Sequence, residues 1–199
     1  MATTVPSIAC LGVIGRNNNP LHITIFPSYD AATQTYAPVR TPLQFSLLLS
    51  GTLDVFEARS RHLATPGAGG GVGGGTMLLS GDFGLLHAVD DRLAAYGFET
   101  NTGVKFVAVV DMRGRPAKIG SAAVGGRGAS GGGGVGLRDN ELKPVFRAVQ
   151  TAYVRLLQNP FYDPDESSGL VGAKRITSRK FGDEIRRIGE VWAPGAASL

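Results

Sequence analysis

Two short stretches that are apolar on both of their alternating faces place the strongest constraint on the fold of this 199-residue chain. Residues 7–14 read SIACLGVI and residues 104–111 read VKFVAVVD, so successive side chains are largely apolar whichever way they point. A strand of this kind must be covered on both faces of its sheet. The sequence therefore predicts two central strands with helices on both sides, which makes a three-layer domain.

Short strands joined by turn residues indicate that the sheet is antiparallel. Residues 21–26 (LHITIF) follow an Asn- and Pro-rich turn and complete an opening hairpin. Residues 77–89 and 92–100 precede the second central strand, and Asp90-Asp91 supply the turn between them. We expect residues 27–42 to form a polar loop.

Three helices are expected from apolar side chains that recur every three or four positions. They cover about residues 43–62, 142–156 and 177–192. The predicted order is β-β-α-β-β-β-α-α. This order defines an α/β (α+β) three-layer sandwich, with a five-stranded antiparallel sheet, one helix on one face and two on the other.

Glycine is concentrated in two stretches of the chain. Of the 29 glycines, 17 lie in residues 66–75 and 113–136, and the rest of the sequence has an ordinary share. We expect a single domain over residues 1–199, with flexible insertions at these two stretches and a short disordered tail over residues 193–199. Insertions of this length cost little, because closure entropy grows only logarithmically with loop length.

The excess of positive charge comes from the second glycine-rich stretch. Four of the 20 lysines and arginines lie in residues 113–136, which contain no acid, and the remaining basic residues equal the 16 acids in number. A basic nucleic-acid-binding fold is therefore disfavoured. The Arg-Gly pairs of that stretch leave RNA binding through a flexible cationic segment as a remote alternative.

No catalytic constellation, cofactor site or metal site is expected. Cys10 is the sole cysteine, which excludes an intrachain disulfide and a thiolate-rich zinc site. Ser130 lies in a G-x-S-x-G pattern, but the pattern sits in a glycine tract and no histidine follows it. No apolar run approaches the roughly 18 residues of a membrane span, so a cytoplasmic or membrane-peripheral protein without a small-molecule substrate is expected.

Several motifs together carry a resemblance to a known family. Residues 137–141 read LRDNE at the start of the second helix, and residues 159–164 read NPFYDP at its end. The first helix contains Leu53-Asp54-Val55. This pattern resembles the sedlin family, the longin-like small subunits of the TRAPP vesicle-tethering complex. The similarity covers nearly all of the chain outside the glycine-rich stretches. In typical members, the connections at the positions of these two stretches are short.

The resemblance implies a longin fold, in agreement with the predicted element order, and a role in assembly. Such subunits are not catalytic; they join other small TRAPP subunits and a large peripheral subunit. The complete complex promotes nucleotide exchange on Rab GTPases at Golgi and related membranes. Two alternatives remain: a family member that binds elsewhere in the complex, and a longin-type regulatory domain for SNARE or GTPase partners.

The first helix is the predicted partner surface. It offers Asp54 and Glu57 beside Leu53 and Phe56, and Asp54 matches the acidic position of the family's Leu-Asp pair. An adaptor needs apolar anchors and selective polar groups on an exposed face. The alternative is that some of these residues cover the sheet.

Two further groups of residues have competing interpretations. Asn159, Pro160, Phe161 and Tyr162 also satisfy the NPF and NPxY sorting motifs, but the favoured interpretation is structural, with the two aromatic residues capping the core. Cations of the last helix could meet anionic lipid or an acidic partner, although acids interrupt them and an ordinary solvated face is as reasonable. These cations are Arg175, Arg179, Lys180, Arg186 and Arg187.

Overall fold

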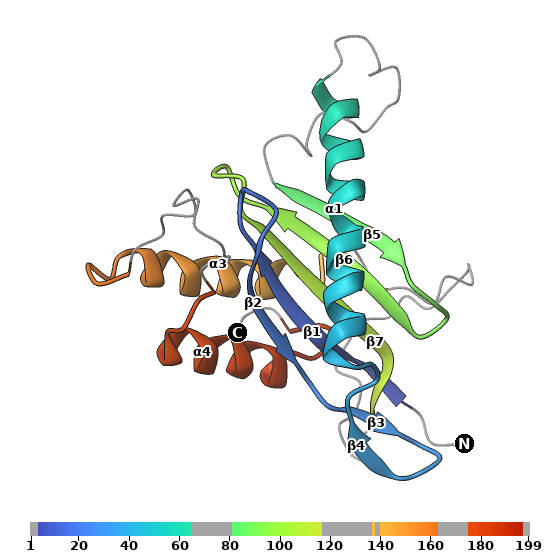
Figure 1. Ribbon diagram of the computed structural model, residues 1–199. Coiled ribbons are helices and arrows are strands. Elements are labelled where there is room, and N and C mark those ends of the chain that lie inside the picture. Colours follow the sequence, from blue (N-terminus) through green and yellow to red (C-terminus); the bar gives the residue numbers. More distant parts are fainter. Residues whose placement is uncertain (1–3, 65–80, 117–136, 138–139, 163–174, 197–199) are drawn as a thin grey trace.

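The computed structural model describes residues 4–64, 81–116, 137, 140–162 and 175–196, and its principal sheet has five antiparallel strands in the order β2-β1-β7-β6-β5. The strands are β1 (Thr4–Ile14), β2 (Pro20–Ile25), β5 (Asp82–Ala88), β6 (Leu93–Glu99) and β7 (Lys105–Pro116). Within these residues the helices are α1 (Pro42–Ala64), α3 (Lys143–Leu157) and α4 (Arg179–Val191). The predicted mixed α/β class and its five-stranded antiparallel sheet are confirmed (Figure 1).

The two doubly apolar stretches form the strands β1 and β7, which pair with each other in the middle of the sheet. Their antiparallel register runs from Ile14 opposite Lys105 to Thr4 opposite Pro116, with two shifts between. Cys10 of β1 and Val109 of β7 are fully buried partners. The prediction that both strands are central is therefore correct.

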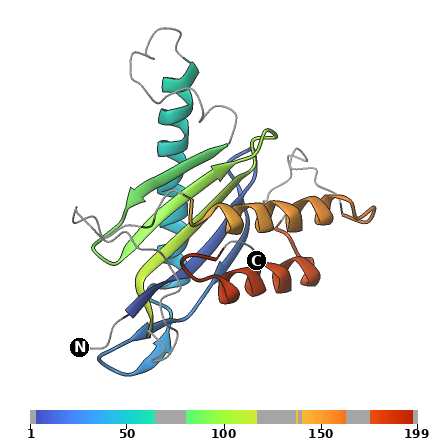
Figure 2. The same cartoon turned by 180° about the vertical axis from the view of Figure 1, so that it is seen from behind.

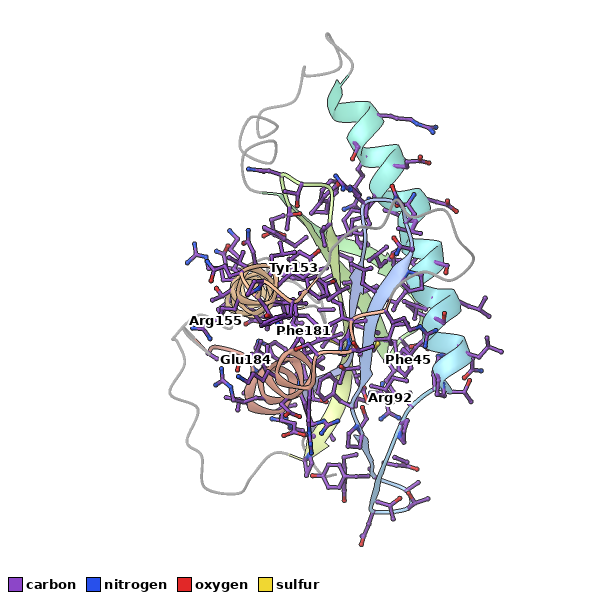
Figure 3. All side chains as sticks on the ribbon, turned by 60° about the vertical axis from the view of Figure 1, so that its left-hand side comes forward. Phe45, Arg92, Tyr153, Arg155, Phe181 and Glu184 are labelled. Atoms are coloured by element: carbon purple, nitrogen blue, oxygen red, sulfur yellow. The ribbon has the colours of Figure 1, made fainter. Side chains whose placement is uncertain are left out.

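Alternate residues of the central strands contribute to two separate hydrophobic clusters, one on each face of the sheet. Val107 and Val109 of β7 pack with Phe45 of α1, whereas Ala108 and Val110 belong to the cluster that includes α3 and α4. Figure 3 shows α1 on one side of the sheet and the two other helices on the opposite side. Seen from behind, α3 and α4 lie next to each other across the sheet (Figure 2). The period-2 alternation of a strand thus builds the three layers.

The stretch predicted as a polar loop contains a small second sheet, so that prediction is wrong for part of residues 27–42. The sheet is a hairpin of β3 (Ser28–Asp30) and β4 (Thr35–Ala37). The Asp30 carboxylate accepts hydrogen bonds from the Ala32 N–H and the Thr33 hydroxyl, both at 3.0 Å. Gln34 adopts a φ of 55°, which completes the turn. Side-chain hydrogen bonds of this local kind commonly fix tight turns.

The last strand is longer than the sequence indicates. β7 continues through Pro116, four residues into the stretch predicted as the second insertion, because Thr4 and Val5 extend β1 and pair with Pro116 and Arg115. Arg115 also donates a hydrogen bond to the Trp192 carbonyl at 3.2 Å. At the carboxyl end, the N–H of residue 196 donates to the carbonyl of residue 193 at 3.1 Å, so the start of the predicted tail forms a turn.

Several predictions concern residues outside those that the structure describes. The first insertion, residues 66–75, lies outside them, and so does the second insertion from residue 117 onward, including Ser130. The same holds for residues 197–199 of the tail. Flexibility of these stretches remains a prediction.

A carboxylate organises the turn between β5 and β6. Asp90 accepts hydrogen bonds from the N–H groups of Arg92 and Leu93, at 2.8 and 2.6 Å, and from the Arg40 guanidinium at 2.7 Å. Desolvation by burial would raise the pKa of Asp90, but these hydrogen bonds and the nearby Arg40 charge outweigh it and hold the pKa below its ordinary value. The charged form of Asp90 therefore stabilises the fold.

Replacing Asp90 by asparagine should remove a pH-dependent contribution to stability. A carboxylate with a lowered pKa in the folded state stabilises above the unfolded pKa, here near 3.8, and this contribution is lost as the pH falls through the folded value. At pH 7 we expect D90N to lower the free energy of unfolding by about 1 kcal/mol, measured by urea denaturation. The difference from wild type should shrink as the pH falls below 3.8 and through the lowered folded-state pKa. A difference that stays the same from pH 7 through this acidic range would contradict this assignment.

Candidate partner surfaces

Helix α1 begins at a capping box that fixes its first turn. The Gln44 side chain accepts a hydrogen bond from the Thr41 N–H at 2.9 Å, and the Thr41 hydroxyl accepts one from the Gln44 N–H at 3.3 Å. Pro42 stands at the first helical position, where its missing N–H costs nothing. The helix phase that follows decides which residues face the sheet.

The inner face of α1 packs closely against the sheet. Phe45, Leu49 and Phe56 are buried there, and glycines in the strands make room for them. A Cβ on Gly12 would come within 2.8 Å of the Leu49 side chain, and one on Gly97 within 2.5 Å of the Phe56 ring. Larger residues at these two positions would push the helix away from the sheet.

The predicted partner residues fall on different sides of α1, and one of them is misassigned. Phe56 is fully buried in the core, so it is not an anchor on an exposed surface. Leu53 is half-buried against the same cluster. Asp54 and Glu57 are exposed, and Glu57 forms an ion pair with Arg61 at 3.4 Å.

The outward face of α1 carries two large apolar residues that the sequence reasoning missed. Leu43 is 69% exposed and Leu47 is 64% exposed. Spacings of four and seven residues place them with Asp54 on one side of the helix, here named the outward row of α1. The helix phase was the available signal, because buried positions 45, 49 and 56 require positions 43, 47 and 54 to point outward.

Two side-chain hydrogen bonds tie α1 to the edge of the sheet. The Arg59 guanidinium donates to the carbonyls of Phe83 and Leu85 in β5, at 2.6 and 2.7 Å. Beside them, a groove of about 380 Å³ runs between the helix and the sheet edge, and Leu48, Val55 and His87 contribute to its lining. The outward row of α1 therefore stands on a helix whose position is fixed by packing and by hydrogen bonds.

The structure overturns part of the interpretation of the sequence Asn159-Pro160-Phe161-Tyr162. Phe161 is 95% exposed and does not cap the core, whereas Tyr162 is half-buried against it. The Asn159 side chain accepts a hydrogen bond from the Phe161 N–H at 3.2 Å, and the Asn159 carbonyl accepts one from the Tyr162 N–H at 2.9 Å. The side-chain bond at Asn159 makes an Asx-type turn, which directs the ring of residue 161 outward.

The cations predicted on the last helix all lie on the surface, on the opposite side of the sheet from α1. Arg175 precedes the helix, and Arg179, Lys180, Arg186 and Arg187 are exposed on α4. The helix begins at Ser178, whose hydroxyl accepts a hydrogen bond from the Phe181 N–H. Among the described residues, Arg187 forms an ion pair with Glu184 at 2.9 Å.

Two further features are the state of the Cys10 thiol and the length and hydrophobicity of the helices. Cys10 is buried in the sheet, and desolvation raises the pKa of its thiol to about 12, so the thiolate is strongly disfavoured. None of the helices in the described part of the chain is long and apolar enough to cross a membrane.

The architecture is that of a longin-like fold, and a family comparison agrees with it. The Sedlin family model matches residues 13–191, so this chain belongs to the sedlin family. Among curated relatives, the chain is similar to trafficking protein particle complex subunit 2-like proteins from several organisms. The mouse protein is 27% identical over 175 residues, which cover 86% of this chain and 89% of the relative.

Relatives from other organisms show a similar level of identity. The Dictyostelium discoideum subunit 2-like protein is 25% identical over 183 residues, covering 91% of this chain and 95% of the relative. The Xenopus tropicalis protein is 28% identical over 159 residues, covering 79% and 84% respectively. The predicted family resemblance is confirmed over most of the chain.

Proposed function

We propose that this chain is a non-catalytic assembly subunit of a trafficking protein particle complex. The observation that supports this function is the outward row of α1. Its residues Leu43, Leu47 and Asp54 are exposed on a helix that packing and hydrogen bonds hold against the sheet. The relatives are named as subunit 2-like members of such a complex. A row of apolar anchors beside one acidic group is the composition expected of a docking surface.

Burial of the two leucines is large enough to matter for assembly. Full burial of a leucine side chain contributes roughly 1.5–3 kcal/mol, and both side chains are more than half exposed in the isolated chain. Asp54 adds selectivity, because a partner must offer a hydrogen-bond donor or a cation opposite it. Since α1 is already ordered, little additional entropy is lost when the partner binds.

The finer function follows the family. We propose that its partners are other small TRAPP subunits and a large peripheral subunit. The complete complex then acts on Rab GTPases, so this subunit serves them indirectly. The proposed location is the cytoplasm, at Golgi and ER–Golgi membranes. The rival within the family is sedlin itself, which shares this fold and binds at a different place in the complex. A longin-type domain for SNARE or GTPase partners is the second rival; identification of the co-purifying chains discriminates among the three.

The remote RNA-binding alternative is weakened by contacts at the start of the cationic stretch. Arg115 donates hydrogen bonds to the carbonyls of Trp192 and Glu190. Arg113 forms an ion pair with Asp91 at 3.6 Å. Both arginines thus have partners within the fold, which reduces their availability for phosphate groups.

Charge reversal at Asp54 and removal of the two leucines should each weaken assembly. We expect D54K, and separately the double variant L43S/L47S, to reduce binding to the purified partner subunits at least about tenfold, which corresponds to about 1.4 kcal/mol. The free energy of unfolding should change by less than about 0.5 kcal/mol, because all three side chains are exposed. Affinity is measured by co-purification and titration.

A matched control places the same change of charge on the other layer. E190K alters an exposed acid of α4 and should leave this affinity unchanged. If D54K and L43S/L47S bind their partners as wild type does, the outward row of α1 is not the docking surface.

A further inference from the structure

A groove lies between α3 and α4, on the opposite side of the molecule from the outward row of α1. Its volume is about 670 Å³. Ala152 and Leu156 of α3 and Phe181 of α4 give it an apolar floor, and each of these three residues is itself buried. The floor is therefore recessed between the two helices, and an apolar side chain must enter the groove to reach it.

Charged side chains form the walls of this groove. Arg155 comes from α3, and the other charged residues, Lys180, Asp183, Glu184 and Arg187, come from α4. Glu184 lies 2.9 Å from Arg187 on its own helix and 3.9 Å from Arg155 on the facing helix. Figure 3 shows Arg155 and Glu184 on the side of their helices that points away from the sheet. One carboxylate is thus shared between two guanidinium groups.

Three cations and two acids line the groove, so one positive charge is in excess there. The side chains of Arg155 and Arg187 are 69% and 52% exposed, so both can turn toward a ligand. Lys180 has no ion pair with any of the residues that the structure describes. The contact from Glu184 to Arg155 is also too long for a good charge-assisted hydrogen bond, which lies near 2.7–2.9 Å.

We propose that this groove binds an acidic amphipathic segment of a partner protein. Its apolar side chain fills the space over Leu156 and Phe181, and its carboxylates bind Arg155, Lys180 and Arg187. Glu184 occupies the position of a partner carboxylate in the free chain and is displaced from Arg155 when the segment binds. This surface is separate from the outward row of α1 and gives the subunit a second contact on its opposite face.

The shape and the charge pattern favour a peptide over a membrane surface. The apolar floor is recessed, whereas a planar bilayer is best met by protruding apolar groups. Asp183 and Glu184 also stand among the cations and would face an anionic lipid surface directly. A helix can enter the groove, which a planar surface cannot, and can place its carboxylates against Arg155, Lys180 and Arg187 and away from these two acids.

The test titrates the full-length chain with a defined probe. The probe is a fluorescein-labelled helical peptide with leucines at i, i+3, i+4 and i+7 and glutamates elsewhere, and binding is followed by fluorescence anisotropy. We expect K180E/R187E to weaken binding about tenfold, because exposed charge pairs contribute modestly and two are reversed. We expect E184Q to tighten binding about threefold, since it frees both arginines from the internal competitor.

Three controls distinguish the proposed groove from simpler explanations. D54K on α1 should bind the probe as wild type does, so failure here is separable from failure of the α1 surface. A peptide with serines in place of the leucines should bind much more weakly. Circular dichroism should show that K180E/R187E and E184Q remain folded, because these side chains lie at the surface.

Several results would overturn the proposal. If E184Q binds the probe no better than wild type, Glu184 is not a stand-in for a partner carboxylate. If the serine peptide binds equally well, the attraction is charge alone and the apolar floor has no role. If vesicles containing phosphatidylserine bind the chain with the same dependence on Lys180 and Arg187 while the peptide does not, the surface contacts lipid.

Discussion

Replacing Arg92 by methionine is expected to lower the free energy of unfolding by about 3–5 kcal/mol, because it leaves a buried carboxylate without its cationic partner. Arg92 donates two hydrogen bonds to Asp111, from Nε and from the guanidinium terminus, both at 2.8 Å. Asp111 is fully buried in the middle of β7. The guanidinium also donates to the Tyr29 carbonyl at 3.1 Å, which joins the β3–β4 hairpin to the main sheet.

A double variant separates the cost of an orphaned charge from the net contribution of the pair. Replacing both partners with apolar residues, as in R92M/D111L, removes the buried charge and should recover most of the lost stability. Urea denaturation of wild type, both single variants and the double variant completes the cycle. A loss below about 1 kcal/mol in R92M would mean that water reaches Asp111 and replaces the arginine.

The second large effect is expected at Phe56, where a predicted partner residue is a core residue instead. Truncation of a fully buried phenylalanine typically costs about 3–5 kcal/mol. The ring packs edge-on against Phe83 of β5, with centroids 4.9 Å apart, and lies directly above Gly97. We expect F56A to lower the free energy of unfolding by about this amount, measured by chemical denaturation.

An exposed leucine of the same helix provides the matched control. L47A removes an apolar side chain that is 64% exposed and should change stability by less than about 0.5 kcal/mol while weakening assembly. F56A should lower stability but leave assembly unchanged under conditions in which the variant remains folded. If F56A proved fully stable yet failed to bind partners, the assignment of Phe56 to the core would be wrong.

The sheet was predictable where the pattern of hydrophobicity leaves one solution. Residues 7–14 and 104–111 are apolar on both faces, and only central strands can bury both faces at once. The β3–β4 hairpin was not predictable in the same way. Its strands are three residues long, and it depends on Asp30 turn bonds and on the distant contact between Arg92 and Tyr29.

The candidate surface on α1 was only half predicted, and the reason is geometric. The predicted residues are close to Asp54 in the sequence, whereas a helix places consecutive residues on different sides of its axis. The exposed residues on the same side as Asp54 are Leu47, about two turns away, and Leu43, about three turns away. The prediction that Phe161 caps the core is wrong for a related reason. The turn at Asn159 determines the direction of the side chain, and its hydrophobicity does not.

The central claim is that this subunit docks onto a trafficking complex through the outward row of α1. Site-specific photo-crosslinking in cells tests it most directly, with the crosslinker placed at position 47 and, as a control, at position 190 of α4. We predict that position 47 crosslinks to one defined subunit of the complex, identified by mass spectrometry. D54K should abolish this product, and position 190 should not yield it. A chain that yields no such product from position 47, or the same product from both positions, would contradict the account.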